Sequence, residues 1–181
     1  RLGKDSGFFP VDYQYLDKFT DCILHAAGQA DLLAMWHLNM EDFVIEEYAN
    51  QADLTFLFRL EPWLYNGCPW SAALKGKKVL VIHPFEDTIR AQYERRSKLF
   101  PGTDILPEFE LHTLKAIQTL CGEKDDRFGT WFEALDYMYK EAMKIDFDIA
   151  IIGCGAYGMP LAAMLKEAGK QAIHLGGATQ L

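Results

Sequence analysis

The chain has 181 residues, of which 50% are hydrophobic and 24% are charged, and this composition excludes a disordered, collagen-like or low-complexity protein. Its formal net charge of -8 repels polyanions, so we expect no nucleic acid partner. The sequence has no run of about 18 apolar residues, so we also expect no membrane span, and we predict a single domain over residues 1–181 that can be part of a longer chain.

The cysteines indicate a reducing environment. They lie far apart and form no C-x-x-C pair, which fits neither a zinc site nor a dense disulfide framework; they are Cys22, Cys68, Cys121 and Cys154. We therefore expect a cytoplasmic location.

The first predicted elements are a helix over residues 12–28 and a strand over 32–36. Apolar residues recur at helical spacing after Asp12, which can cap the helix. The run LLAMW at 32–36 is short and apolar, which suits a strand buried on both faces.

A short helix over about 40–49, capped by Asn39, and a second buried strand at 54–58 continue a βαβ pattern. The next strand, at 79–82, consists mostly of β-branched residues and ends at His83. These elements predict a sheet whose strands alternate with helices.

A helix over 87–98, with Asp87 as its cap, is predicted next. Residues 109–117 are ambiguous, because apolar and polar residues alternate as in a strand while Leu111, Leu114 and Ile117 are also spaced for a helix. We predict a strand there, because the surrounding elements alternate between helix and strand.

The sequence TWFE at 130–133 is a capping box that begins a helix. A strand at 148–152, a helix over 156–168 and a strand at 171–174 complete the chain. The predicted fold class is α/β, with a mainly parallel, doubly wound, Rossmann-like sheet of about six strands and helices on both faces.

In such a sheet, ligands bind beyond the carboxyl ends of the strands, so residues that follow a strand are candidate site residues. Three of the five histidines fall there, namely His37, His83 and His174. The alternative is that each histidine only ends a strand where polar groups must reach water.

The sequence GCGAYG at 153–158 follows a predicted strand and opens a predicted helix, as the dinucleotide fingerprint requires. Gly153, Gly155 and Gly158 would let backbone amides approach a phosphate at the helix N-terminus. The next strand ends in His174 instead of an acidic ribose ligand, and only seven residues follow it. We therefore expect a mononucleotide or sugar-nucleotide phosphate site, with NAD as one alternative and glycines that serve only helix packing as another.

The aromatic loop from Glu61 to Trp70 follows the second strand and should reach the same edge. Its rings could stack on a sugar or base, or could simply close the end of the core. Glu61 could act as a general base or bind a hydroxyl group.

We expect no metal site. Asp146-Phe147-Asp148 resembles a D-x-D metal motif but precedes its strand, which places it at the amino edge, and the three histidines could share a metal only if their strands were adjacent. Asp125-Asp126 is interpreted as solvated surface, and Cys154 as a packing residue.

Two blocks, Lys144–Leu181 and Trp70–Phe85, carry a family resemblance. The sequences DIAIIGCG at 148–155 and KQAIHLGG at 170–177 resemble the C-terminal segment of bacterial glycosyltransferases of the D-type fold. The sequence GKKVLVIHPF at 76–85 is similar to the central strand of that group and of a related set of uncharacterised bacterial proteins. The resemblance covers about the C-terminal two-thirds of the chain.

The resemblance implies a Rossmann-like domain that binds a nucleoside-diphosphate sugar and transfers the sugar to an acceptor hydroxyl. The glycines Gly153, Gly155, Gly158, Gly176 and Gly177, with His174, would bind the donor diphosphate; His83 would donate a hydrogen bond to its charge, and Glu61 would be the base. The group's acidic Gly-Asp-Gly-Glu-like motif is not found in this sequence, so either it lies upstream of Arg1 or the protein is a non-catalytic nucleotide-binding module. An NAD-dependent oxidoreductase is a third, less favoured alternative.

Overall fold

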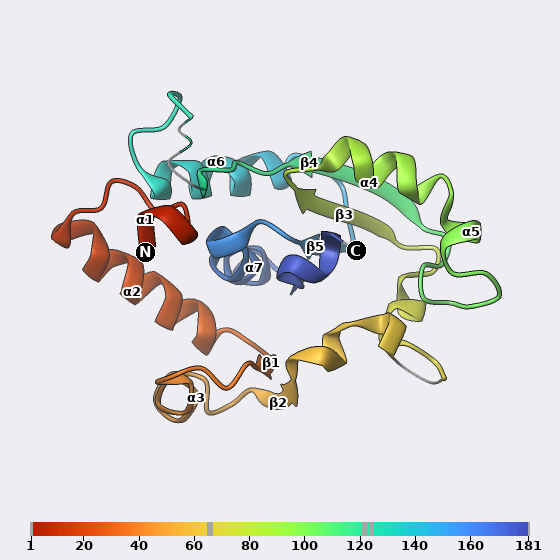
Figure 1. Ribbon diagram of the computed structural model, residues 1–181, viewed down its shortest axis with the longest axis horizontal. Coiled ribbons are helices and arrows are strands. Elements are labelled where there is room, and N and C mark those ends of the chain that lie inside the picture. The colour runs from red at the N-terminus through yellow and green to blue at the C-terminus, as the bar shows by residue number, and fades with distance from the viewer. Residues whose placement is uncertain (1, 65–66, 121–122, 124, 181) are drawn as a thin grey trace.

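The computed structural model describes residues 2–64, 67–120, 123 and 125–180. It is an α/β structure whose six strands pair only in parallel in the described part of the chain. A four-stranded sheet has the order β4-β3-β5-β6, and a two-stranded sheet pairs β1 with β2 (Figure 1). The strands are β1 (Leu32–Met35), β2 (Asp53–Phe56), β3 (Lys78–His83), β4 (Glu110–Lys115), β5 (Ile149–Ile152) and β6 (Gln171–His174).

All six predicted strands are present, but they do not form one sheet of six. In the described residues, β1 and β2 pair in register from Leu32↔Asp53 to Met35↔Phe56 and share no ladder with the larger sheet. Apolar periodicity identifies a strand without identifying its neighbour, so the division into two sheets could not be read from the sequence.

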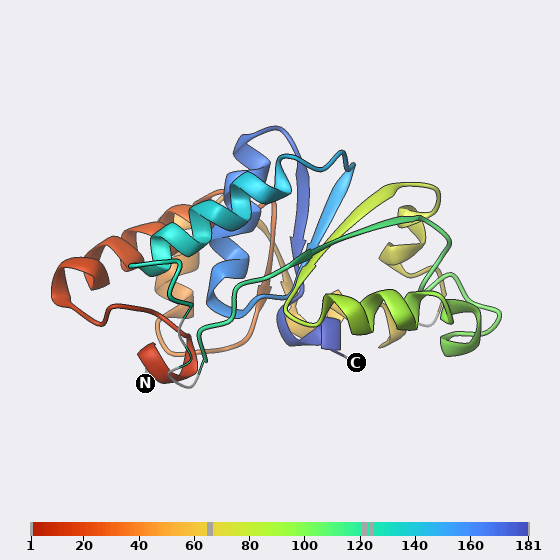
Figure 2. The same cartoon turned by 90° about the horizontal axis from the view of Figure 1, so that it is seen from above.

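The four-stranded sheet is doubly wound. Helix α4 (Glu86–Tyr93) connects β3 to β4, α6 (Trp131–Ala142) connects β4 to β5, and α7 (Gly158–Glu167) connects β5 to β6. Figure 2 shows α6 and α7, together with α2 (Tyr13–Gly28), on one side of this sheet and α4 on the other.

The two faces of the four-stranded sheet bury separate apolar clusters, because successive side chains of a strand point to opposite faces. Leu80 and Ile82 of β3 pack into the cluster that includes Trp131, whereas Val79 and Val81 pack with Phe109 on the α4 side. The expected cover of helices on both faces is therefore confirmed for this sheet.

Capping side chains fix the starts of two helices as predicted. Asp12 Oδ1 accepts the Gln14 N–H at 3.2 Å before α2. Before α6, Thr130 Oγ1 accepts the Glu133 N–H at 3.2 Å, and the Glu133 carboxylate accepts the Gly129 N–H at 2.7 Å.

Two predicted caps are wrong. Met40, rather than Asn39, precedes α3 (Glu41–Tyr48), whose Glu41 carboxylate instead accepts the N–H of Trp36 at 2.8 Å. The predicted helix over 87–98 begins at Glu86 and divides into α4 and a short α5 (Arg96–Leu99), so Asp87 lies inside its first turn. The remaining helix, α1 (Leu2–Asp5), is a single turn.

Large apolar side chains are exposed around β1 and β2. Leu54 and Phe56 of β2 are 48% and 43% exposed, and Trp36 and Phe58 just beyond the strands are 66% and 53% exposed. Within the described ranges, no helix is long and apolar enough to span a bilayer.

Candidate functional site at the carboxyl edge of the larger sheet

Strands β3 and β5 are neighbours, and their following connections run to opposite faces of the sheet. In an open parallel sheet, such a reversal leaves a crevice beyond the strand ends, where ligands bind. His83 is the last residue of β3 and Gly153 directly follows β5, so the crevice begins between these two residues.

A small hollow of about 120 Å³ lies at this edge. Four of the glycines predicted from the sequence line it, namely Gly153, Gly155, Gly176 and Gly177. The other described residues of its lining are Ser6, Pro84, Ile117, Gln118, Thr119, Leu120, Cys154, Ala156 and Tyr157, so the lining as described has no charged side chain.

Backbone amides are available around the hollow. Among the described residues, the N–H groups of Cys154, Gly155, Gly176 and Gly177 take part in no hydrogen bond. Gly155 and Gly176 have φ of +60° and +58°, a backbone conformation that glycine adopts without steric cost. Helix α7 begins at Gly158, one 3₁₀ turn (Gly155–Tyr157) after Cys154, so its positive dipole end faces the same turn.

Gly153 allows a close approach between three segments of the chain. A Cβ at this position would overlap Thr179 Oγ1 and would lie 2.7 Å from His83 Cδ2. Thr179 belongs to the final 3₁₀ turn, η6 (Gly176–Gln180), and its Oγ1 donates to the Gly176 carbonyl oxygen at 2.7 Å. The turn after β6 therefore packs directly over the end of β5.

Gly158 and His174 line neither this hollow nor the wider cleft described below. A Cβ at Gly158 would overlap the His174 ring, so this glycine provides the close helix–strand contact that the third glycine of a dinucleotide fingerprint provides. His174 Nδ1 donates to the Ile152 carbonyl oxygen at 3.3 Å, and burial lowers the pKa of the imidazole. Both residues therefore pack the start of α7 against β5 and β6 and do not face either space.

His83 is almost completely buried, with 1% of its surface exposed. Its Nδ1 accepts the Phe85 N–H at 3.0 Å, so the neutral ring carries its proton on Nε2. Nε2 has no hydrogen-bond partner among the described residues, and burial lowers the pKa of the ring.

A wider cleft of about 740 Å³ adjoins the small hollow. The two share Pro84, Ile117 and Gln118. The charged residues in the described lining of the cleft are Glu86, Lys115, Glu123, Asp125, Asp126 and Arg127. The Arg127 guanidinium donates to both Asp125 carboxylate oxygens and holds the pKa of that carboxyl below its usual value. The described lining contains more carboxylates than basic side chains, so its net charge is negative.

From the sequence, Asp125 and Asp126 were interpreted as solvated surface, and the cleft was not predicted. Its wall combines the end of β4 with the connection to α6, and apolar periodicity carries no signal for how such a connection folds. Ser6, which also lines the hollow, was not predicted either.

A buried hydroxyl network next to Ser6 holds the N-terminal segment beside the hollow. Thr119 Oγ1 donates to the Gly7 carbonyl oxygen at 2.6 Å, and Tyr157 Oη lies 3.1 Å from the same hydroxyl. Tyr157 in turn stacks on Trp131 with ring centroids 4.6 Å apart. Gly7 has φ of +66° and packs against the Thr119 backbone, which fixes this N-terminal segment beside the strand ends.

Glu61 lies between two 3₁₀ turns that follow β2, η1 (Leu57–Leu60) and η2 (Pro62–Leu64), and it lines neither the hollow nor the cleft. In the same loop, Trp70 Nε1 donates to the Leu60 carbonyl oxygen at 3.0 Å and the ring packs on the α4-side cluster, so this ring closes the core as the alternative supposed. Tyr65 and Asn66 lie outside the described residues.

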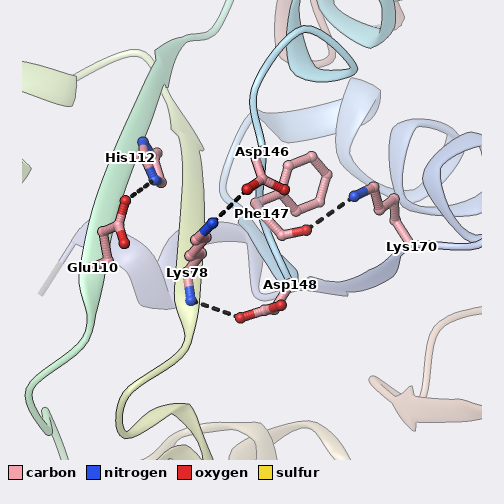
Figure 3. Close-up of polar contacts among 7 residues, drawn as sticks. All are labelled: Lys78, Glu110, His112, Asp146, Phe147, Asp148 and Lys170. Atoms are coloured by element: carbon pink, nitrogen blue, oxygen red, sulfur yellow. Dashed lines mark hydrogen bonds and ion pairs between the residues drawn. The ribbon is translucent and has the colours of Figure 1, made fainter.

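Asp146 and Asp148 lie at the opposite, amino edge of the sheet, as the sequence predicted (Figure 3). Asp146 forms an ion pair with Lys78 Nζ, and Asp148 Oδ2 accepts the Lys78 N–H at 2.8 Å. Both carboxylates therefore join β3 to β5. In the part of the chain that the structure describes, no three or more His, Cys, Asp or Glu residues are grouped to hold a metal ion.

His37 adjoins the two-stranded sheet, where its ring lies 5.8 Å from that of Phe56. Cys154 is buried, and burial raises the pKa of its thiol to about 12, so it is a packing residue and not a nucleophile at neutral pH.

No protein-family model, curated protein or solved structure matches the chain.

Proposed function

We propose that this protein binds a nucleoside-diphosphate sugar, with the diphosphate in the glycine-lined hollow, and transfers the sugar to an acceptor hydroxyl. The observation that carries the binding step is the convergence of Gly153, Gly155, Gly176 and Gly177 from two neighbouring strand ends on one hollow. The unbonded amides at these turns and the start of α7 are the groups that bind phosphate oxygens in other nucleotide sites.

The sizes of the two spaces support this arrangement. A hollow of about 120 Å³ is smaller than the roughly 300 Å³ at which sites for larger ligands begin, and so suits a phosphate group. The adjoining cleft of about 740 Å³ has room for a nucleoside and a sugar. Its carboxylates can accept hydrogen bonds from ribose and sugar hydroxyls but would repel a second anion.

In the proposed transfer, the acceptor oxygen bonds to the anomeric carbon of the sugar while the bond from that carbon to the diphosphate breaks. The electron pair leaves on the diphosphate, and backbone amides at the hollow would stabilise this growing negative charge. The acceptor proton passes to a base. Glu61, expected in that role, lines neither space, so the geometry supports the binding step more strongly than it supports the transfer.

Binding is tested with a thermal-shift panel of UDP, GDP and ADP, their sugars, and NAD. The proposal expects one family of nucleotide sugars to raise the melting temperature, since a ligand that binds only the native state stabilises it. A shift with NAD alone favours the oxidoreductase alternative, and the absence of any shift contradicts nucleotide binding. Isotopically labelled sugar then shows whether a binder is turned over, because a non-catalytic module would bind without consuming it.

Gly177→Val locates the ligand. Gly177 lines the hollow, its φ is not in the left-handed region, and no described heavy atom lies within 4 Å of its missing Cβ, so the isopropyl group should enter free space without strain. We expect at least a tenfold loss of affinity with an unchanged melting temperature. Ser97→Val, on exposed α5, adds a similar side chain away from the hollow and is the matched control. Unchanged affinity in Gly177→Val would remove the hollow from the site.

A further inference from the structure

We propose that His83 is a buried hydrogen-bond donor for the bound phosphate and that the Thr179 hydroxyl occupies the position of a phosphate oxygen until the ligand displaces it. This inference rests on the proposed function, because it assigns residues to the binding of that same ligand. Neither residue is part of the described lining of the hollow; both contact the position of the missing Gly153 side chain, so they would reach the ligand only once the Thr179 hydroxyl moves away.

The proton on His83 has a defined position. The Phe85 N–H donates to Nδ1 at 3.0 Å, so Nδ1 must be the acceptor and Nε2 the donor in the neutral ring. Nε2 is buried and has no partner among the described residues. Buried donors are nearly always satisfied, so an unsatisfied one at a strand end requires an explanation, and a ligand oxygen supplies one.

The Cδ2 edge of the His83 ring faces Gly153. Cδ2, which is bonded to Nε2, lies 2.7 Å from the point where a Cβ of Gly153 would stand. The same point is overlapped by Thr179 Oγ1, so the space left by the missing side chain of Gly153 is already filled by a hydroxyl oxygen of the chain itself.

Thr179 does not satisfy His83. Its hydroxyl instead donates to the Gly176 carbonyl oxygen at 2.7 Å, which holds η6 over the end of β5. A phosphate oxygen in place of this hydroxyl would lie beside the Cδ2 edge of the His83 ring, the atom next to Nε2, at the turn where the Cys154 N–H is free of hydrogen bonds among the described residues. An anion that accepts several hydrogen bonds would therefore be favoured there over a hydroxyl that is already bonded elsewhere.

Two substitutions at His83 separate ligand binding from structural support. In Gln, the terminal amide nitrogen can take the place of Nε2, whereas in Asn the side-chain oxygen can take the place of Nδ1 and keep the bond from the Phe85 N–H. We expect His83→Gln to keep the dissociation constant for the nucleoside diphosphate selected by the panel, and for inorganic pyrophosphate, within about threefold. We expect His83→Asn to raise it about tenfold or more, as for loss of one hydrogen bond to a charged group.

The melting temperatures of the two variants are the control. If His83 had a purely structural role, His83→Asn would bind the ligand more tightly than His83→Gln. If Asn retains affinity while Gln loses it in parallel with stability, His83 serves only the Phe85 turn and the inference is wrong. If both variants bind like the wild type, the inference also fails while the proposed function stands. If the wild type binds no nucleotide, the proposed function itself fails.

Two further measurements keep the inference testable if a His83 variant does not fold. Thr179→Ala removes the competing hydroxyl and should tighten pyrophosphate binding by about threefold, whereas weaker binding would show that Thr179 is itself a ligand contact. In wild-type protein, nitrogen NMR of the imidazoles should show one buried Nε2–H resonance that moves on addition of pyrophosphate, and a resonance that does not move contradicts the contact.

Discussion

Three glycines of one six-residue turn are required for three different reasons. Gly153 allows Thr179 and His83 to meet over the end of β5, and Gly158 allows α7 to lie against His174. Gly155 is free of neighbours in the described residues but has φ of +60°, so its requirement is conformational. A glycine motif therefore predicts a close approach or a special backbone angle, and only the structure distinguishes them.

This distinction makes Gly158→Ala a stability variant. The added methyl would overlap the His174 ring, and overpacking of this kind costs about 1–3 kcal/mol of unfolding free energy. In denaturant unfolding, Gly158→Ala should lower the unfolding free energy of the wild type by that amount. It should lower the unfolding free energy of the His174→Ala variant, which lacks the ring, by less. Gly177→Ala, which meets no described atom within 4 Å, should stay within about 0.5 kcal/mol of the wild type. Equal losses in both backgrounds would contradict the contact.

At the scale of elements, sequence periodicity predicted every strand, and it resolved the ambiguous segment 109–117 correctly in favour of β4. It also placed the glycines at the ends of β5 and β6, because neighbouring parallel strands end at one edge. It could not show that β1 and β2 form a separate sheet, so it placed Glu61 with the glycines. The wide cleft and Ser6 depend on how connections fold back, which periodicity does not encode.

The carboxylates at the amino edge should be separable from ligand binding. Asp146 is exposed and its ion pair with Lys78 is solvated, and water and salt screen such pairs strongly. Asp146→Asn should therefore leave the unfolding free energy nearly unchanged in denaturant unfolding and leave nucleotide affinity unchanged by calorimetry. A loss of affinity that addition of Mn²⁺ restores would instead identify this D-x-D segment as a metal site.

At the scale of the whole molecule, the described residues include a buried imidazole, His83, and a partly buried one, His174, at the carboxyl edge, and these should govern stability in weak acid. Burial lowers the pKa of both His83 and His174 from the usual value of about 6.5, so below that pH the unfolded chain binds more protons than the folded chain. The unfolding free energy should be level above about pH 6.5 with respect to these groups and should fall as the pH falls below it. The slope is at most about 1.4 kcal/mol per pH unit for each proton taken up.

Urea unfolding between pH 5 and pH 8 measures this slope. The pKa values of Asp125 and Asp146 are also lowered, by Arg127 and Lys78 respectively, but these carboxyls titrate in the folded state below their usual value of 3.8 and affect a more acidic range. His83→Gln removes one titrating group and should reduce the slope between pH 5 and pH 6.5. An unchanged slope in that variant would show that other groups cause it.

The hollow is surrounded by backbone N–H groups, whose dipoles do not depend on which side chains the chain carries. The chain has a formal net charge of -8, and substitutions on its surface can change that charge. They leave the backbone N–H groups around the hollow in place as long as the glycine turns keep their conformation. Because long-range attraction to a basic patch would contribute little, ionic strength should affect recognition in the hollow far less than it affects sites built from arginine and lysine.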